Sequence, residues 1–341
     1  MEVLVPYLTV FAVAAVSAAA LVPLTARLGR RLGIVDRPGG RRTHRGEVSR
    51  LGGISLFFSF MLALAAGLGF RIPTADPNES LRLLGLVLGS AWMLLVGLAD
   101  DRWDLPSLAQ LAAQMAAGAI AILTLIFIEQ VNNPLTNRVE SFPPALVIPL
   151  TMFWVVGMIN TVNWLDGLDG LAAGVGAILC AILAIHMHRM GQPSVAILPL
   201  ALLGASVGFL PYNFHPARVF MGTSGAFFMG YALGCLGIIA GARVATVLLV
   251  MGIPIVDVAW QIVDRLRRGR SVARGDRGHL HFRLLDLGLS QRAIVLAYWA
   301  FCALFGLLAL TISSRLYKLV ALLLLGGMVA AAMLILTRHR S

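Results

Sequence analysis

The sequence predicts an all-α, polytopic membrane protein with about eleven transmembrane helices. Of its 341 residues, 59% are hydrophobic and only 13% are charged, and the mean hydropathy is +0.86. Soluble domains contain about 45–50% apolar and about 25% charged residues, so one water-soluble core cannot hide this excess. The apolar runs are continuous rather than alternating, which disfavours a membrane β-barrel.

Apolar runs of about 20 residues are long enough to cross a bilayer as helices. No internal repeat is evident, which disfavours a transporter built from inverted repeats. We therefore expect a single integral membrane domain over residues 1–341. The predicted spans are 3–25, 52–70, 81–99, 107–128, 143–159, 165–187, 193–210, 225–240, 243–263, 292–312 and 318–336.

The basic residues set the predicted orientation. Segment 26–50 carries eight Arg against two acids, and segment 264–291 carries seven Arg against three. The positive-inside rule places both segments in the cytoplasm. With eleven spans, the N-terminus lies outside and the C-terminus lies in the cytoplasm. The predicted cytoplasmic loops, which contain nearly all of the polar clusters, are 26–51, 100–106, 160–164, 211–224 and 264–291.

Asp100 and Asp101 form an acidic pair at the end of a predicted span, directly before Arg102. Two adjacent carboxylates at a membrane border are costly unless they bind a cation or contact water. A solvated helix end with an ion pair to Arg102 is the alternative. We expect the pair to belong to a functional site, because the other polar clusters fall on the same predicted side.

The most specific polar pattern runs from Asn160 to Gly170, where Asn or Asp stands at every third position. A step of three residues turns an ideal helix by about −60°, so neighbouring members share a face. The glycines in this run would loosen the turn and bring Asp166 and Asp169 onto one ligand. A purely structural role is the less favoured alternative, because buried carboxylates and amides need partners.

Segment 211–225 is predicted to be a loop that leads into a span. Phe220 lies beside a glycine-rich turn, which suits stacking on a nucleobase. Residues 222–225 offer backbone N–H groups near a helix start, which suits phosphate binding. An ordinary turn with a helix cap explains the same residues equally well.

Two basic loops complete the set of clusters. They contain, in order, Asp36, Arg41, Arg42 and His44, and then Arg277, His279 and His281. With no Cys or third His near the His pair, zinc is not expected, and His with Arg facing a diphosphate is favoured. Positive-inside orientation explains the first loop as well, and anionic lipid would explain part of the second.

Carboxylates and Arg/His side chains on one face of the membrane indicate a divalent cation with a phosphate-bearing substrate. Mg²⁺ fits best, because the available ligands are oxygens and no thiolates lie near. The lipid side of such a site would admit a long-chain lipid phosphate. The net charge of +11 is therefore assigned to orientation and phosphate binding, and nucleic acid is not an expected partner.

Taken together, the clusters resemble the polyprenyl-phosphate N-acetylhexosamine-1-phosphate transferase family. The chain is more similar to the glycan-initiating branch, the undecaprenyl-phosphate GlcNAc-1-phosphate transferase-like proteins, than to the branch that makes the first peptidoglycan lipid. The resemblance extends from about residue 36 to 285. It rests on Asn-x-x-Asn-x-x-Asp-Gly-Leu-Asp-Gly-Leu-Ala-x-Gly at 160–174, the Asp-Asp pair, Asn-Phe-x-Pro-Ala-x-x-Phe-Met-Gly at 213–222 and Asp-Arg-x-His-Leu-His at 276–281.

The resemblance implies an enzyme that transfers a sugar 1-phosphate, most simply GlcNAc-1-phosphate, from a UDP-sugar to undecaprenyl or another polyprenyl phosphate. UMP would leave, and the product would start a lipid-linked cell-envelope glycan such as lipopolysaccharide or teichoic acid. The family requires Mg²⁺ or Mn²⁺. The resemblance also implies a bacterial-type plasma (inner) membrane with its lipids as surroundings, and it leaves open whether the chain forms a homodimer.

Roles for individual residues follow from the same resemblance. Phe220 would stack on the uracil, and the His pair would hold the diphosphate or the sugar. The residues implied to be catalytic and to bind the metal are Asp100, Asp101 and Asp169. The residues implied to bind substrate are Arg41, Arg42, His44, Asn163, Asp166, Asn213, Phe220, Arg277, His279 and His281.

Three positions depart from the family pattern. Thr223 stands where the family has an Asp that looks like its principal metal ligand, Ala226 replaces a Ser, and Phe282 replaces a third His. A hydroxyl is a far weaker ligand for a hard cation than a carboxylate. Three alternatives are open: the other carboxylates suffice for the metal, metal affinity is lowered, or the chain is an impaired member that binds lipid or nucleotide. An active enzyme is favoured, and a transporter is a more distant alternative.

Overall fold

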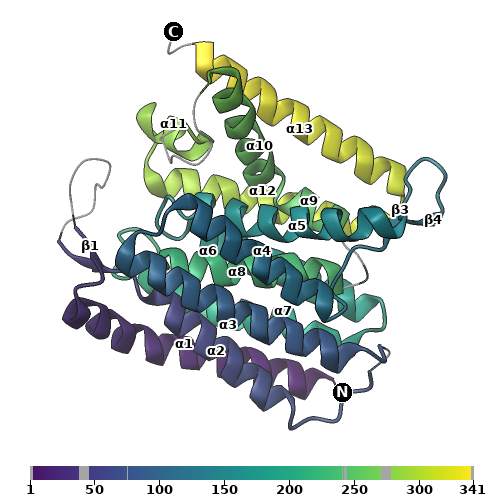
Figure 1. Ribbon diagram of the computed structural model, residues 1–341, viewed down its shortest axis with the longest axis horizontal. Helices are drawn as coiled ribbons and strands as arrows, with labels where there is room; N and C mark the ends of the chain where they lie inside the picture. The colour runs from purple at the N-terminus through teal and green to yellow at the C-terminus, as the bar shows by residue number, and fades with distance from the viewer. Residues whose placement is uncertain are drawn as a thin grey trace.

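The computed structural model describes residues 3–37, 46–74, 76–239, 241, 244–269 and 278–338, and this part of the chain is mainly helical (Figure 1). The helices are α1 (Leu4–Leu32), α2 (Gly52–Gly67), α3 (Glu79–Trp103), α4 (Ser107–Leu123), α5 (Pro144–Leu165), α6 (Leu171–Arg189), α7 (Pro193–Asn213), α8 (Gly222–Ile239), α9 (Val244–Val250), α10 (Gly252–Arg267), α11 (Leu280–Asp286), α12 (Gln291–Thr311) and α13 (Arg315–Arg338).

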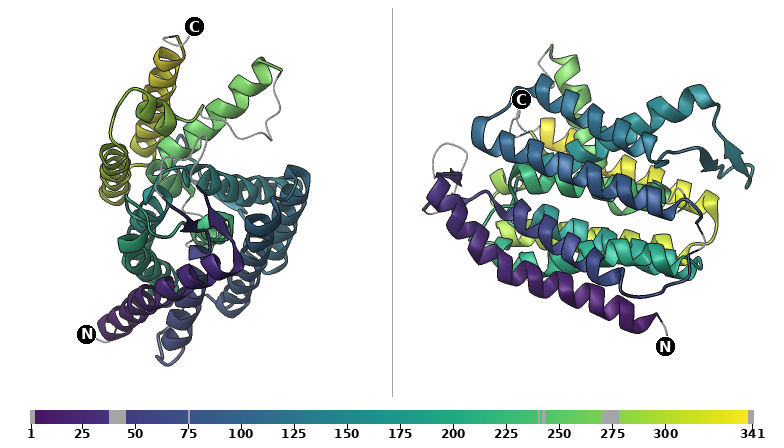
Figure 2. Two further views of the ribbon diagram at one scale, coloured as in Figure 1. Left: turned by 90° about the vertical axis from the view of Figure 1, so that its left-hand side faces the viewer. Right: turned by 60° about the horizontal axis from the view of Figure 1, so that its bottom comes forward.

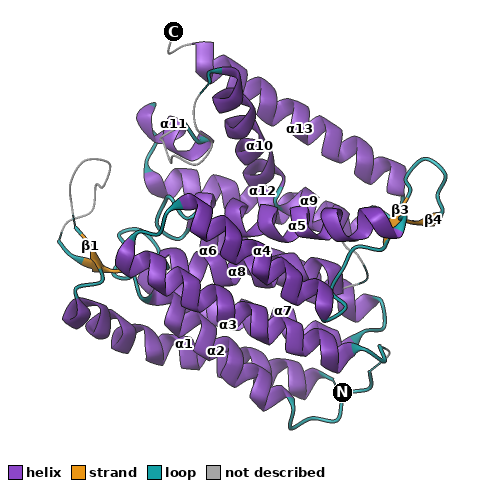
Figure 3. Ribbon diagram, in the orientation of Figure 1, coloured by secondary structure: helices purple, strands orange, loops and turns teal. Residues whose placement is uncertain are grey.

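Two short antiparallel hairpins are the strands of the described chain, and they mark the two ends of the bundle (Figure 3). Strands β1 (Val35–Asp36) and β2 (Val48–Ser49) pair in the connection between α1 and α2. Strands β3 (Gln130–Asn132) and β4 (Val139–Ser141) pair in the connection between α4 and α5. The candidate site lies at the end that carries β1 and β2.

Helix α8 is the centre of the bundle, and every residue from Gly222 to Ile239 is buried. It packs against α3 and α5, while α1 packs against α7 and α2. Its glycines permit close approach: a Cβ on Gly230 would lie 2.6 Å from the Cα of Ile159 in α5. Small residues let membrane helices approach closely. Close packing matters there because lipid tails are as apolar as the side chains, so burial of apolar surface does not drive helices together.

The membrane-protein class predicted from the sequence is confirmed. Among the described residues, eight helices are long and apolar enough to cross a membrane, or nine if the bent pair α9–α10 counts as one span. The span predicted over 243–263 is not one straight helix, because α9 and α10 meet at an angle of 83°. Leu325 of α13 fills the space beside Gly252 at the bend, and Pro254 lies in the first turn of α10.

Several predicted loops are shorter than expected, because polar residues continue the helices. Helix α3 includes Asp100 and Asp101, and α5 continues to Leu165, so the predicted cytoplasmic segment 160–164 is helical. Polar side chains in these turns have hydrogen-bond partners within the bundle, such as Thr161 Oγ1 to the Gly157 carbonyl at 2.7 Å. Helices α1, α7, α10 and α11 likewise extend into the predicted loops 26–51, 211–224 and 264–291.

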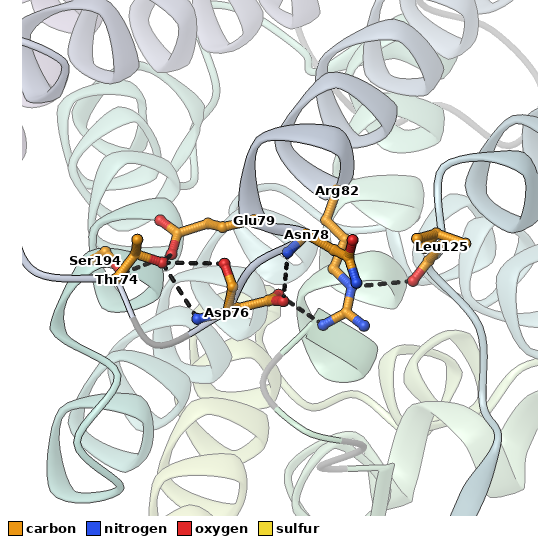
Figure 4. Close-up of polar contacts among 7 residues, drawn as sticks. All are labelled: Thr74, Asp76, Asn78, Glu79, Arg82, Leu125 and Ser194. Atoms are coloured by element: carbon orange, nitrogen blue, oxygen red, sulfur yellow. Dashed lines mark hydrogen bonds and ion pairs between the residues drawn. The ribbon is translucent and has the colours of Figure 1, made fainter.

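A polar network anchors the first turn of α3 at the end of the bundle far from Asp100 and Asp101 (Figure 4). Arg82 Nη1 lies 2.7 Å from Asp76 Oδ2, and Arg82 Nε donates to the Leu125 carbonyl at 3.1 Å. Ser194 Oγ, at the start of α7, donates to Glu79 Oε2 at 2.8 Å. These contacts tie α3 to its neighbours and thereby fix the axial position of the acidic pair.

Candidate active site

Asp101 joins α3 to the amino end of α8. Its Oδ1 accepts from the backbone N–H of Thr223 at 2.9 Å, and its Oδ2 accepts from that of Ser224 at 3.0 Å. The first N–H groups of a helix have no partner within the helix and carry its positive end. Asp101 therefore caps α8 from another helix, and Arg50 Nη2 lies 3.1 Å from Oδ1 on the same carboxylate.

The backbone of the β2 segment brings Arg50 to this point. Phe220 N donates to the Ser49 carbonyl at 2.9 Å, and Gly52 N donates to the Phe220 carbonyl at 3.1 Å. Gly222 has φ +70°, and a Cβ there would lie 2.2 Å from the Arg50 carbonyl oxygen. The close approach of these two segments therefore requires glycine at the start of α8.

Two glutamines of helix α4 form hydrogen bonds with Asp100 of the acidic pair and Asn160 of the Asn-rich motif. Gln110 Nε2 donates to Asp100 Oδ1 at 2.8 Å. Gln114, one turn further along α4, accepts through Oε1 from Asn160 Nδ2 at 2.7 Å. Residues four apart lie on one helix face, so a single face of α4 orients both motifs. Asp100 faces α4, whereas Asp101 faces α8, so the adjacent carboxylates have different surroundings.

The turn after α5 is closed by its contacts with the segment before α8. Asp169 Oδ2 accepts from the Ala217 N–H at 3.0 Å and lies 2.8 Å from His215 Nδ1. Asn213 Oδ1 accepts from the Gly170 N–H at 3.1 Å, and Asn213 Nδ2 donates to the Val219 carbonyl at 3.0 Å. Asn213 is buried, so its amide holds the two segments together, and its predicted role in binding substrate stays a prediction.

Asp166 and Asn163 are the motif members with open polar atoms. Both are half-buried, and no hydrogen bond to their side chains occurs within the described ranges. Burial raises the pKa of Asp166 well above its usual range, and the negative charges of Asp101 and Asp169 raise it further. The Arg50 guanidinium offsets part of this rise in pKa, and the turn thus presents a carboxyl group without a hydrogen-bond partner among the described residues.

The His pair approaches this turn from the start of α11 and contacts α10. His279 Nδ1 lies 3.0 Å from Asp257 Oδ2, and the two His rings stack with centroids 5.6 Å apart. A Cβ on Gly167 would lie 2.5 Å from His281 Nε2, which places His281 against the turn. The Trp164 ring lies beside the His pair, with its centroid 5.6 Å from that of His279.

His281 is predicted to make the protein sensitive to acid. Burial lowers its pKa to about 3 from 6.5, so the unfolded chain binds one more proton between these values. The neutral, buried His281 therefore contributes fully to the free energy of unfolding above pH 6.5. This contribution declines as pH falls and is smaller by about 2 kcal/mol at pH 5. Thermal melting in detergent at pH 7 and pH 5 should show a smaller acid shift for His281→Gln than for the wild type. His188→Gln, at an exposed His, should keep the wild-type shift.

Not every predicted site residue can be placed. Arg41, Arg42, His44 and Arg277 lie outside the described residues. Phe220 is half-buried in the segment before α8, and Thr223 lies in the first turn of α8 with little exposure. The structure brings the remaining members to one end of the bundle, seen end-on in Figure 2, left.

Five residues with contacts in this region carried no site prediction. They are Arg50, Gln110, Gln114, His215 and Asp257. Arg50 was counted among the basic residues of its segment, and Gln110 and Gln114 share a helix face at a spacing of four. Asp257 stands alone within an apolar run, and an ionisable residue inside a span is itself a signal of function.

The donor chemistry of the site fits a hard cation, although the side chains are not arranged as a finished metal site. Oxygen atoms of carboxylates and amides are the ligands that Mg²⁺ prefers. Within the described ranges, no three His, Cys, Asp or Glu side chains form a group that could hold a metal ion. Asp166 has the open carboxylate, while Asp100, Asp101 and Asp169 accept hydrogen bonds from the protein.

Known proteins resemble this chain over most of its length. The sequence profile of glycosyl transferase family 4 matches residues 83–241. The decaprenyl-phosphate N-acetylglucosaminephosphotransferase of Mycobacterium tuberculosis is 32% identical over 335 residues, which cover 89% of this chain and 82% of the relative. The chain belongs to the polyprenyl-phosphate N-acetylhexosamine-1-phosphate transferase family. The resemblance predicted from the motifs is thereby confirmed.

Other members of the transferase family span two branches. The probable undecaprenyl-phosphate N-acetylglucosaminyl 1-phosphate transferase of Bacillus subtilis is 28% identical over 320 residues, covering 92% of this chain and 87% of the relative. The phospho-N-acetylmuramoyl-pentapeptide-transferase of Halalkalibacterium halodurans is 28% identical over 314 residues, covering 88% and 94%. The matched regions include the α3, α5 and α8 segments that form the site.

Proposed function

We propose that this transferase moves GlcNAc-1-phosphate from UDP-GlcNAc to a polyprenyl phosphate and releases UMP, which starts a lipid-linked cell-envelope glycan. The names of the Bacillus and Mycobacterium relatives support the sugar and the lipid acceptor. The observation that carries the proposal is the open Asp166 carboxylate beside Asp101 and Asp169, with the His pair against the same turn. This combination suits a cation and a diphosphate.

The proposed site faces the cytoplasm of a bacterial-type inner membrane. The eight long helices, the bent pair and the two shorter apolar helices α2 and α4 together would cross the membrane eleven times. An odd number of crossings puts the termini on opposite sides. The Arg-rich last turn of α1 leads into β1, whose partner strand precedes Arg50, and Arg265 in the last turn of α10 lies over Trp164, which supports a cytoplasmic position for the end with the acidic pair.

Mg²⁺ or Mn²⁺ would bind next to Asp101, Asp166 and Asp169. Such a cation supplies neutralisation of phosphate charge during transfer. Asp166 adds an open carboxylate to the predicted ligands Asp100, Asp101 and Asp169. Asp100 accepts through Oδ1 from Gln110 and from the Leu105 N–H at 3.0 Å, so it would also fix the end of α3.

The proposed reaction is an in-line displacement at phosphorus. An oxygen of the lipid phosphate bonds to the β-phosphorus of the UDP-sugar, the bond from this phosphorus to the bridging oxygen breaks, and UMP leaves with that oxygen. A phosphate monoester has its second pKa near 6, so at pH 7 most of the acceptor is already a dianion. An Asp base adds little, and the protein would act mainly by aligning the two phosphates and offsetting their charge.

A direct assay of the purified chain in detergent tests the proposal. UDP-GlcNAc, undecaprenyl phosphate and Mg²⁺ should yield UMP and the lipid diphosphate sugar by mass spectrometry, and omission of the lipid should stop UMP release. Thr223→Asp should also be active and reach half-maximal rate at a lower Mg²⁺ concentration, because it adds a carboxylate beside Asp101. No UMP from either protein with any UDP-sugar tried would contradict the proposal.

Thr223 supports one second candidate function. A chain that lacks this carboxylate could bind the nucleotide or the lipid without turnover, since a hydroxyl is a weak ligand for Mg²⁺. Activity in Thr223→Asp together with silence in the wild type would establish this impaired form. Product from the wild type would exclude it.

A further inference from the structure

Asp257 in α10 is a buried carboxylate with two contacts to the His segment. Its Oδ2 lies 3.0 Å from His279 Nδ1, and its Oδ1 accepts from the Leu280 N–H at 3.0 Å. Its exposed fraction is 4%, and that of His279 is 5%. Both oxygens of the carboxylate are thus directed at the residues that open α11, so Asp257 fixes the ring and its backbone together.

We propose that Asp257 is a positioning residue that keeps the proton of His279 on Nδ1 and turns Nε2 toward the phosphates of the nucleotide sugar. The inference rests on the proposed function, which places the diphosphate at the His pair. An imidazole that gives its Nδ1–H to a carboxylate has a fixed tautomer and orientation. Its Nε2 is then the nitrogen available to a ligand.

The contacts around His279 leave its ring little other freedom. One neighbour is the His281 ring, stacked at an interplanar angle of 10°, and another is the Trp164 ring at 52°. The Arg265 guanidinium lies over Trp164, 5.7 Å from the ring centroid. Among the described residues, the charged and titratable groups around the ring include Asp257, His281 and Arg265. Tyr298 lies close enough to Asp257 to interact with it electrostatically. Within the described residues, Nδ1 is the ring nitrogen of His279 with a hydrogen-bond partner.

The choice of a carboxylate over an amide has a chemical consequence. Asp257 can accept from both His279 Nδ1–H and the Leu280 N–H. An Asn could accept only through its carbonyl, so after retaining the Leu280 bond it would donate its NH₂ to Nδ1 and move the ring proton to Nε2. Asp257→Asn therefore keeps the shape and both contacts, and it reverses the tautomer.

Steady-state kinetics test the positioning role. Asp257→Asn is expected to lower kcat/KM for the UDP-sugar by about tenfold to a hundredfold and to leave KM for polyprenyl phosphate unchanged. Asp264→Asn is the matched control, because Asp264 lies on the same helix and pairs with Arg268 at 2.9 Å on its exposed side. It should retain wild-type kinetics.

A double variant separates positioning from general damage to the fold. If Asp257 acts through His279, then Asp257→Asn combined with His279→Gln should be no slower than His279→Gln alone, within about twofold. Multiplied losses would assign Asp257 a structural role and overturn the inference. Wild-type kinetics in Asp257→Asn would overturn it as well.

Nitrogen-15 NMR of histidine-labelled protein provides a readout that does not depend on turnover. The His279 signals, assigned by their loss in His279→Gln, should show the Nδ1–H form in the wild type and the Nε2–H form in Asp257→Asn. An unchanged tautomer would overturn the inference even in an active enzyme. If the wild type makes no UMP while Asp257→Asn still changes the His279 tautomer, the proposed reaction is refuted and the control of the His279 ring by Asp257 stands.

Discussion

Replacing Asp101 with Asn is expected to lower turnover by about a thousandfold or more and to lower the melting temperature as well. An Asn offers one carbonyl oxygen, so one of the two α8 N–H groups loses its acceptor. Arg50 loses its buried anionic partner at the same time. Breaking a buried pair by removing one partner costs about 3–5 kcal/mol. UMP release and thermal melting in detergent measure the two effects.

The Arg50→Gln variant separates the structural part of this effect from the catalytic part. In Arg50→Gln/Asp101→Asn no guanidinium is left without its anion, so the melting temperature should partly recover relative to Asp101→Asn. Turnover should not recover, because the carboxylate is still absent. Near wild-type turnover in both Asp100→Asn and Asp101→Asn at saturating Mg²⁺ would disprove a catalytic role for the acidic pair.

Replacing Asp166 with Asn is expected to have opposite effects on activity and stability. Turnover should fall by about a hundredfold or more, because the open carboxylate of the site is lost. The raised pKa of Asp166 means that the folded protein prefers the neutral acid, so its ionised form destabilises the fold at pH 7. An Asn is permanently neutral, so the melting temperature should rise.

Asp169→Asn is the matched control for this pair of effects. Asp169 lies in the same turn, yet its carboxylate accepts from the Ala217 N–H and contacts His215. Its replacement should lower both turnover and the melting temperature. A fall in melting temperature for Asp166→Asn comparable to that of Asp169→Asn would contradict the description of Asp166 as an open, destabilising carboxylate.

The helices were largely predictable, since the sum of apolar residues along each run sets where a helix can cross a bilayer. The bounds of the helices were less predictable at polar turns. Asn160 and Asp100 belong to helices because glutamines on α4 satisfy their side chains, and such partners are not adjacent in the sequence. The bend between α9 and α10 escaped prediction because Leu325, which fills the space at Gly252, lies far along the chain.

The site was predictable as a set of motifs and much less as a set of contacts. Spacing in the run from Asn160 to Gly170 indicated the turn that carries Asp166, and the acidic pair was evident at once. Asp100 is directed toward α4 and Asp101 toward α8, and this difference between adjacent residues depends on tertiary packing. Asp257 gave no local pattern, and its role appears only when α10 and α11 are placed together.

The cap on α8 has a consequence for how this chain tolerates change at position 223. Asp101 contacts the backbone N–H of Thr223, and any non-proline residue supplies that group. The anchoring of the central helix is therefore independent of the side chain at this position. A carboxylate at residue 223 can be gained or lost without loss of the backbone bond to Asp101, so substitution there would change the affinity for the proposed cation while the helix cap is retained.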